Sequence, residues 1–206
     1  MSKNTYVTSD THFTHKNIIK FQNRPFSSID EMDTALIENW NSIVNKDDEV
    51  YHLGDFGWKD NAANLKILKQ LNGTKYLVRG NHDFWLIQDK QIQNEFEWIK
   101  DYHEIKLPEG MIVMCHYPFT TWNMSHYGSI NLCGHTHGSL KTLPHQFDVG
   151  VDVFNFKPIP FSLIVLLELI VFLIELIIIF IIFCPIFNFN RFPYNYRLSN
   201  FFSTLL

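Results

Sequence analysis

Short runs of apolar residues alternate with polar residues through the first three quarters of the chain. An apolar period of two predicts strands, whereas apolar residues three and four positions apart predict amphipathic helices. Strands are therefore expected at residues 5–10, 48–55, 74–81, 103–107, 111–116, 129–135 and 146–153. Helices are expected at residues 27–44, 61–71 and 91–99. Because helices alternate with strands early and strands dominate later, the pattern predicts an α/β layered fold whose sheets have mixed strand directions.

The pattern changes abruptly near Pro158. Twenty of the 23 residues at 161–183 are apolar. The exceptions are Ser162, Glu168 and Glu175. A helix of this length matches a hydrocarbon core about 30 Å thick, and its apolar residues favour insertion by roughly 6–12 kcal/mol, opposed by roughly 2.5–3.5 kcal/mol for each glutamate. The sequence therefore predicts a domain at residues 1–157 and a hydrophobic tail at residues 158–206.

Three interpretations of the tail stay open at this stage. In the first, residues 161–183 form a transmembrane helix that holds the first domain on the cytoplasmic side of a membrane. In the second, the segment is amphipathic or forms an interface between copies of the chain, whose oligomeric state the sequence leaves undetermined. In the third, the tail is a frameshift-derived extension, because an AT-rich gene read in the wrong frame yields such runs of Ile, Leu, Phe and Asn.

Charge and cysteine content exclude some classes of protein. The net charge is −4 and the basic residues form no runs, so sequence-specific nucleic-acid binding is not evident. The three cysteines, Cys115, Cys133 and Cys184, match no zinc motif, and we expect reduced thiols in a cytosolic protein. The N-terminus lacks an apolar run, so no signal peptide is expected.

Side chains that bind metal ions follow five of the predicted strands. The motifs, in order, are DTH at 10–12, GD at 54–55, GNH at 80–82, CH at 115–116 and GHTH at 134–137. Sheets of α/β proteins bind ligands outside the carboxyl ends of their strands. Two divalent ions about 3.5–4 Å apart need a set of ligands like the one that these motifs supply, including one bridging carboxylate. The inventory is Asp10, His12, Asp55, Asn81, His116, His135 and His137. Its two negative charges against four positive ones leave a net cationic site that suits an anionic substrate.

In their order and spacing, these five motifs resemble those of the calcineurin-like metallophosphoesterases, whose pattern is D-x-H, GD, GNH, H and GH-x-H. The resemblance covers about residues 4–155, and the segment SDTHFTHKNIIKFQNRPF is most similar to the small phosphoesterases of phages and bacteria. It implies a four-layer αββα sandwich with a dinuclear metal site at one sheet edge. It also implies a metal-dependent hydrolase acting on a phosphomonoester or phosphodiester, either a small molecule or a nucleotide.

The resemblance also implies a role for each motif residue. One ion would be held by Asp10, His12, Asp55 and His137. The other would be held by Asp55, Asn81, His116 and His135. Asp55 would bridge the two ions, a hydroxide between them would attack phosphorus, and His82 would donate a proton to the leaving group or clamp the phosphate together with Asn81. Mn²⁺ is the expected ion, with Ni, Fe and Zn as alternatives. A non-catalytic metal-binding scaffold and a membrane-anchored regulatory protein stay as alternative functions.

The stretch GDFGWKD at 54–60 departs from the family pattern. Many relatives carry an Asp-Arg pair where this chain has Trp58 and Lys59. The departure argues against a phosphoprotein phosphatase and leaves open which residue orients His82, with Asp83 as one candidate.

Several other side chains are expected near the site or in the core. Arg24 is interpreted either as a bidentate donor to the substrate phosphate or as a support for the site. His15 is expected in a solvated loop and His52 in the core. Tyr117 and His126 lie in a loop that is a candidate for shaping the substrate pocket.

Overall fold

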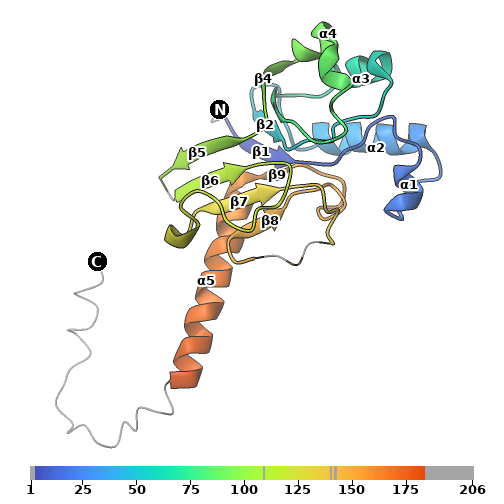
Figure 1. Ribbon diagram of the computed structural model, residues 1–206. Helices are drawn as coiled ribbons and strands as arrows, with labels where there is room; N and C mark the ends of the chain where they lie inside the picture. The colour runs from blue at the N-terminus through green and yellow to red at the C-terminus, as the bar shows by residue number, and fades with distance from the viewer. Residues whose placement is uncertain (1–2, 109, 140, 142, 184–206) are drawn as a thin grey trace, which may run out of the picture. The chain divides into compact units, whose positions relative to one another are not determined.

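We describe the protein from a computed structural model, which covers residues 3–108, 110–139, 141 and 143–183. The chain divides into two compact units, and the first ends at Val165. Two mixed sheets form most of the first unit, with helices on both sides (Figure 1). This arrangement confirms the predicted fold class.

The first sheet has five strands in the order β4-β3-β2-β1-β9. These strands are β1 (Thr5–Thr8), β2 (Glu49–His52), β3 (Thr74–Val78), β4 (Phe96–Lys100) and β9 (Ile159–Pro160). Strands β1 to β4 are parallel, and β9 runs antiparallel to β1. Because parallel strands point the same way, the residues that follow β1, β2 and β3 meet at one edge of this sheet.

The second sheet has four strands in the order β5-β6-β7-β8. They are β5 (His103–Leu107), β6 (Gly110–Met114), β7 (Ile130–Cys133) and β8 (Gln146–Asp148). Strands β5 and β6 form an antiparallel hairpin, whereas β6, β7 and β8 are parallel. A parallel bridge between Ser9 and Gly150 joins the ends of the two sheets, so the residues after β6 and β7 approach those after β1.

The helices of the described residues are mostly short. They are α1 (Ile18–Phe21), α2 (Ile29–Asn41), α3 (Asn61–Leu68), α4 (Lys90–Gln93), α5 (Phe161–Phe183) and the 3₁₀ turns η1 (Leu86–Gln88) and η2 (Ser125–Tyr127). Helix α2 begins at Ser28, whose side chain accepts a hydrogen bond from the Glu31 N–H. Apolar residues of α2 and α3 pack with the first sheet in one core cluster, and a second cluster fills the space between the sheets.

One prediction about the elements is wrong, and the first compact unit continues past the predicted domain boundary, to Val165. The helix expected at residues 91–99 ends at Gln93, and residues 96–100 form β4 instead, pairing with β3. The boundary expected after Lys157 separates residues that the structure keeps together. Ile159 pairs with Val7 of β1, and Phe161 and Ile164 are buried in the cluster between the sheets.

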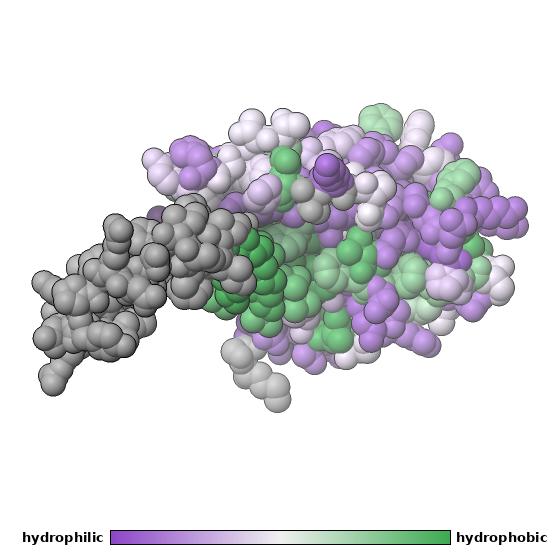
Figure 2. All heavy atoms as spheres, turned by 90° about the horizontal axis from the view of Figure 1, so that it is seen from below, coloured by the Kyte–Doolittle hydropathy of each residue, from purple (hydrophilic) through white to green (hydrophobic). Residues whose placement is uncertain are grey.

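Beyond Val165, the described side chains of α5 are apolar except for that of Glu168. The exposed side chains include Leu166, Leu169, Ile170, Leu173, Ile174 and Ile177. By length and composition alone, residues 161–179 qualify as a membrane span. Figure 2 shows a hydrophobic surface, in green, formed by described residues of α5. Cys184 and the rest of the tail lie outside the described residues.

Candidate metal centre

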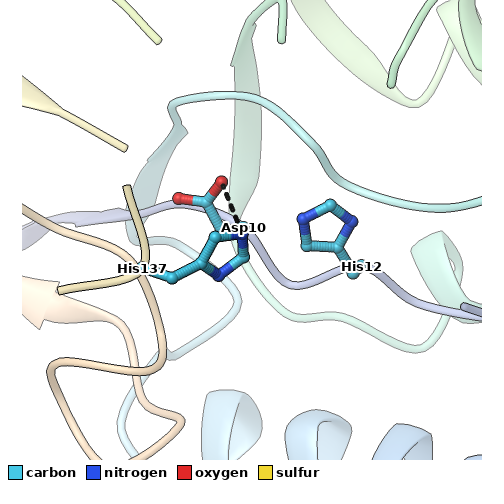
Figure 3. A group of neighbouring side chains, drawn as sticks. All are labelled: Asp10, His12 and His137. Carbon is cyan, nitrogen blue, oxygen red and sulfur yellow. Dashed lines mark ion pairs between the residues drawn. The ribbon is translucent and has the colours of Figure 1, made fainter. Parts of the chain in front are cut away.

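The predicted metal ligands gather in two groups at the shared edge of the sheets. In the first group, ligand atoms of Asp10, His12 and His137 lie within 4.8 Å of one another (Figure 3). In the second, those of Asp55, His116 and His135 do so. Each group contains residues that follow strands of both sheets, so neither sheet alone forms the site.

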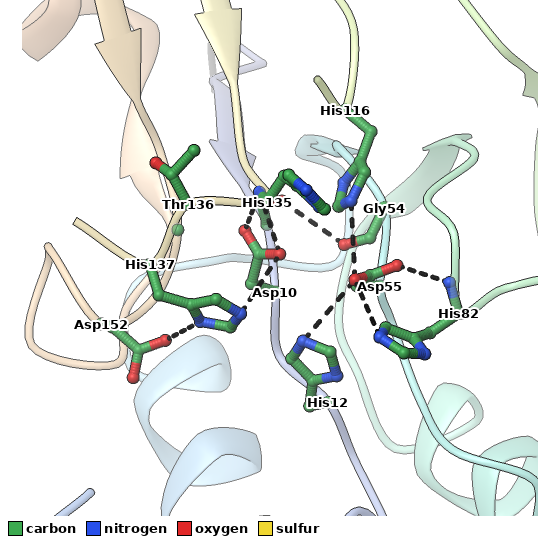
Figure 4. Close-up of polar contacts among 12 residues, drawn as sticks. Asp10, His12, Gly54, Asp55, His82, His116, His135, Thr136, His137 and Asp152 are labelled. Atoms are coloured by element: carbon green, nitrogen blue, oxygen red, sulfur yellow. Dashed lines mark hydrogen bonds and ion pairs between the residues drawn. The ribbon is translucent and has the colours of Figure 1, made fainter. Parts of the chain in front are cut away.

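Asp55 lies between the two groups (Figure 4). Its Oδ2 is 3.7 Å from Nε2 of His12 and 3.5 Å from Nε2 of His116. The seventh predicted ligand, Asn81, has its Oδ1 3.1 Å from Nε2 of His116. The structure thus brings all seven residues together, with the carboxylate predicted to bridge in the middle.

The backbone at the site is strained. Five of the seven residues have positive φ angles. They are Asp10 (57°), His12 (50°), Asp55 (56°), His135 (71°) and His137 (49°). A non-glycine residue rarely adopts this region, which costs about 1–3 kcal/mol each time and persists only where surrounding contacts impose it. Such strain is concentrated at functional sites, and here it directs side chains from several loops toward one point.

Asp83 supplies many of the contacts that hold this backbone. Its buried carboxylate accepts hydrogen bonds from the N–H groups of Asp55, Phe56 and Gly80, at 2.9, 2.9 and 2.7 Å. Burial raises the pKa of Asp83 to about 6. Asp83 therefore clamps the loops after β2 and β3, and it is these backbone groups, not the His82 ring, that its carboxylate holds.

Glycines allow the loops to approach this closely. A Cβ on Gly80 would lie 2.2 Å from Oδ1 of Asp55. A Cβ on Gly134 would lie 2.4 Å from Oδ2 of Asp10 and 1.9 Å from Oγ of Ser9. In both cases the clash falls on a predicted metal ligand, which explains the physical need for glycine before Asn81 and before His135.

Burial disfavours the charged forms of two site histidines, His12 and His116, and of the site carboxylates. Desolvation lowers the pKa of His12 well below its usual value and that of His116 to about 4. It also raises the pKa of Asp10 to about 8, and the pKa of Asp55 is raised by burial too. A neutral imidazole is the form that binds a metal, and a buried carboxylate needs a cation nearby.

His12 gives the clearest sign that the site is built for cations. Both ring nitrogens are buried and have no hydrogen-bond partner among the described residues. Buried polar atoms nearly always form hydrogen bonds, so two buried ring nitrogens without a hydrogen-bond partner need an explanation, such as a bound ion. The mixed nitrogen and oxygen donors suit first-row transition metals. The residues present therefore fit two divalent ions.

Two histidines are oriented by partners that sequence reasoning missed. Nδ1 of His116 lies 2.8 Å from the carbonyl oxygen of Leu53, and Nδ1 of His137 lies 2.7 Å from Oδ2 of Asp152. Each contact occupies Nδ1 and leaves Nε2 directed into the site, as is usual for metal-binding histidines. Asp152 lies in the predicted strand 146–153, and nothing in that stretch of sequence marks it as part of the site.

Arg24 occupies the far side of Asp152. Its guanidinium donates to both carboxylate oxygens of Asp152, at 2.8 Å each, and to the carbonyls of Asp10 and Thr11. The residue is only 4% exposed. Of the two roles left open for Arg24, the geometry favours the support of the site over a contact with substrate.

Asp152→Asn tests this chain of contacts. The substitution weakens the acceptor of His137 and removes the charge that Arg24 faces. We expect the affinity of the first group for Mn²⁺ to fall about 10–100-fold, as for other partners of metal-binding histidines. Titration of the metal-free protein with Mn²⁺ checks this, with the exposed Asp30→Asn as the matched control. Equal affinities in the two variants would contradict the role of Asp152.

His82 stands beside the metal groups rather than in them. Its side chain is 35% exposed, and its Nε2 lies 3.9 Å from Oδ2 of Asp55. Its N–H donates to Oδ1 of Asp55 at 2.8 Å. The ring centroid is 4.9 Å from that of Trp58 and 5.3 Å from that of His12. Trp58, at the position of the missing Asp-Arg pair, thus positions His82 by ring contact.

Burial and contacts bear on three further expectations. The prediction that His15 lies in a solvated loop is wrong, because the residue is 8% exposed and its ring centroid lies 4.4 Å from that of Trp58. His52 is buried as expected, and its Nε2 lies 2.9 Å from Oγ1 of Thr11. Tyr117 contacts the rings of His116 and His135, whereas His126 is exposed and packs on Tyr127.

The loop after His12 depends on an acidic residue of α2. The N–H of Thr14, whose φ is 65°, donates to both oxygens of Asp33. Burial raises the pKa of Asp33 to about 6. The folded state therefore holds this proton more tightly than the unfolded state, so the stability that the group contributes is lost as the pH rises from about 4 to 6.

Asp33→Asn is expected to stabilise the protein at pH 8 by about 1–2 kcal/mol, a value discounted for the partial exposure of the side chain. The amide keeps an oxygen for the Thr14 N–H and removes the charge. The gain should shrink as the pH falls toward 4. Urea unfolding at pH 8 and pH 5 measures it, with the exposed Asp47→Asn as control. A gain that does not depend on pH would show that Asp33 is not the responsible group.

Comparisons with known proteins show the family of this chain. Residues 4–146 match the model of the calcineurin-like phosphoesterase superfamily domain. An uncharacterized protein of Methanocaldococcus jannaschii is 37% identical over 169 residues, covering 78% of this chain and 88% of the relative. The Gene 66 protein of Mycobacterium phage L5 is 26% identical, covering 74% of this chain and 88% of the relative.

A solved structure is also similar. A protein of unknown function from Aquifex aeolicus superposes with a TM-score of 0.65 at 28% identity, covering 79% of this chain and 98% of that chain. With two mixed sheets and candidate metal ligands at their shared edge, the domain has the fold of the metallophosphoesterases. The chain belongs to the calcineurin-like phosphoesterase superfamily.

Proposed function

We propose that the protein is a dinuclear metal-dependent hydrolase that cleaves a phosphomonoester or phosphodiester. The observation that supports this most is the placement of Asp55 between two groups of metal-binding side chains, with His82 beside it. The two groups converge from four strand ends, Asn81 joins them from a fifth, and their carboxylates are buried. Both features suit cations that in turn attract an anionic ester.

Each residue has a defined task in the proposed reaction. Asp10, His12 and His137 would hold one ion, and His116, His135 and Asn81 the other, with Asp55 shared. Two such ions supply a water of lowered pKa and charge stabilisation for the phosphoryl oxygens. Asp152 and the Leu53 carbonyl orient imidazoles, while His82 holds a proton at Nε2 for the leaving oxygen or clamps the phosphate.

The first experiment uses the full chain in detergent. The protein is stripped of metal, supplied with Mn²⁺, Ni²⁺, Fe²⁺ or Zn²⁺, and assayed with bis(p-nitrophenyl) phosphate and p-nitrophenyl phosphate. We expect hydrolysis that returns with metal, is greatest with Mn²⁺, and is lost in Asp55→Asn. A folded protein that binds two ions and cleaves neither ester would favour the metal-binding scaffold instead. The ratio of the two rates distinguishes a diesterase from a monoesterase.

We propose further that α5 attaches this cytoplasmic domain to a membrane. Apart from Glu168, its described side chains beyond Val165 are apolar, and most of them are exposed, as expected for a helix surrounded by lipid. Flotation with phospholipid vesicles, comparing the full chain with a chain ending at Val165, tests the proposal. The full chain should float and the shorter chain should not. Soluble oligomers of the full chain would favour an interface between copies. An intact mass below 24.4 kDa for the protein from its native source would show that the native protein lacks the tail.

A further inference from the structure

A cavity opens beside the second metal group. Its volume is about 520 Å³, within the range of pockets that bind small molecules. Its lining includes Arg79, Asn81, Phe84, Asp101, Cys115 and Tyr117. Asn81 belongs both to this wall and to the predicted ligand set, so a group in the cavity would be continuous with an ester at the metals. None of the tasks described above uses the other five side chains.

Two aromatic rings give the cavity its character. Phe84 is 54% exposed and Tyr117 is 45% exposed, although both are large hydrophobic residues. The Tyr117 ring lies against His116 and His135, with centroids 5.0 and 4.9 Å apart, so it stands next to the metal group. Exposed aromatic faces beside a phosphate site are the usual platform on which a nucleobase stacks.

The polar part of the lining suits the edge of a base. Nη2 of Arg79 lies 2.6 Å from Oδ1 of Asp101, with the two side chains 42% and 70% exposed. The pair is neutral overall, which disfavours a second phosphate. It nevertheless presents both N–H donors and carboxylate acceptors, which match the donor and acceptor edge of a nucleobase.

The position of His82 indicates which of the two ester substituents on phosphorus would occupy the cavity. The His82 ring contacts His12 and Trp58 on the side of the first group. The cavity lies on the side of Asn81 and Tyr117, which contact His116 of the second group. A substituent in the cavity is therefore the part that stays on phosphorus, while the leaving oxygen faces His82.

On the basis of the proposed phosphoesterase activity, we propose that this cavity binds the nucleobase of a nucleotide diester and makes nucleoside phosphodiesters the preferred substrate class. Phe84 and Tyr117 stack on the base, and Arg79 with Asp101 bonds its edge. Hydrolysis would break the bond between phosphorus and the other ester oxygen, release that alcohol with a proton, and leave a nucleoside monophosphate.

The test compares substrates with one leaving group. The full chain with Mn²⁺ is assayed with the p-nitrophenyl esters of thymidine 5′-phosphate and adenosine 5′-phosphate, and with ethyl p-nitrophenyl phosphate. We expect kcat/KM to be about tenfold higher for at least one nucleoside ester, mainly through KM, as stacking on an aromatic side chain provides. Phe84→Ala and Tyr117→Ala should bring this ratio close to one. Tyr127→Ala, an exposed aromatic outside the lining, should retain it.

The outcomes separate this inference from the proposed function. Equal kcat/KM for all three esters, or a preference that survives both substitutions, would overturn the nucleobase site while upholding the hydrolase. If no ester is cleaved, the proposed function fails. Equilibrium dialysis with thymidine 5′-monophosphate and adenosine 5′-monophosphate then judges the site. Retention by the native chain and not by Phe84→Ala supports it, and equal retention or none overturns it.

Discussion

His82→Ala is expected to lower kcat by about 10²–10⁴-fold, the usual contribution of a positioned proton donor. The side chain stands outside both metal groups, so both ions should still bind. Its Nε2 is 3.9 Å from the Asp55 carboxylate, close to where a phosphoryl group would meet the metals. Metal content and kcat, measured on the same samples, check the two parts of this expectation. The exposed His126→Ala serves as the matched control.

The identity of the leaving group decides between the two roles of His82. A proton donor matters little when the leaving group is p-nitrophenolate, which is stable without a proton, and matters greatly for an alkoxide. A clamp on the phosphate matters equally for both. We therefore expect a larger loss with an alkyl ester than with the nitrophenyl ester. Equal losses would assign His82 to the clamp, and loss of bound metal would place it among the ligands.

A chain that ends at Lys157 is expected not to fold, whereas a chain that ends at Val165 should. The shorter chain lacks Ile159, Phe161 and Ile164, which are 4%, 6% and 0% exposed. Each fully buried side chain of this kind contributes about 1.5–3 kcal/mol, so the loss is about 5–9 kcal/mol. The whole stability of a domain is only about 5–15 kcal/mol. The loss of β9, which pairs with β1, adds to this deficit.

Circular dichroism and urea unfolding of the two truncated chains measure the difference. A further variant, Ile164→Ala in the chain ending at Val165, should lose about 2–5 kcal/mol as a large-to-small change at a buried site. Leu163 is not the matched choice, because it is partly buried against the same cluster. Ser162→Ala, an exposed position on the same turn, is the control. A cooperative unfolding transition in the chain ending at Lys157 would restore the boundary that the sequence predicted.

The candidate ligands were predictable because each follows a strand directly. Asp10 and His116 follow the last residues of β1 and β6 by two positions, and Asp55 follows the last residue of β2 by three. The ends of these strands share one edge. What a local pattern cannot give is contact between distant segments. Asp152 reaches Arg24 across 128 residues and His137 across 15, so its role exists only in the folded chain.

The errors in the predicted elements have the same physical origin. Residues 96–100 alternate weakly, and their pairing with β3 overrides the helical pattern that begins at Lys90. β9 is only two residues long, too short for any period to reveal, and it forms because β1 offers an unpaired edge. His15 was misplaced because a loop residue becomes buried only when Trp58 arrives from the next loop.

The pairing of β9 with β1 has a consequence for how the protein is made. Strand β1 leaves the ribosome early, but its partner β9 consists of residues that lie more than 150 positions later in the chain. Those residues immediately precede the apolar part of α5, so the domain completes its core only as that segment emerges. Any cellular machinery that takes up the nascent apolar helix therefore competes, during synthesis, with the docking of Phe161 and Ile164 onto their own domain.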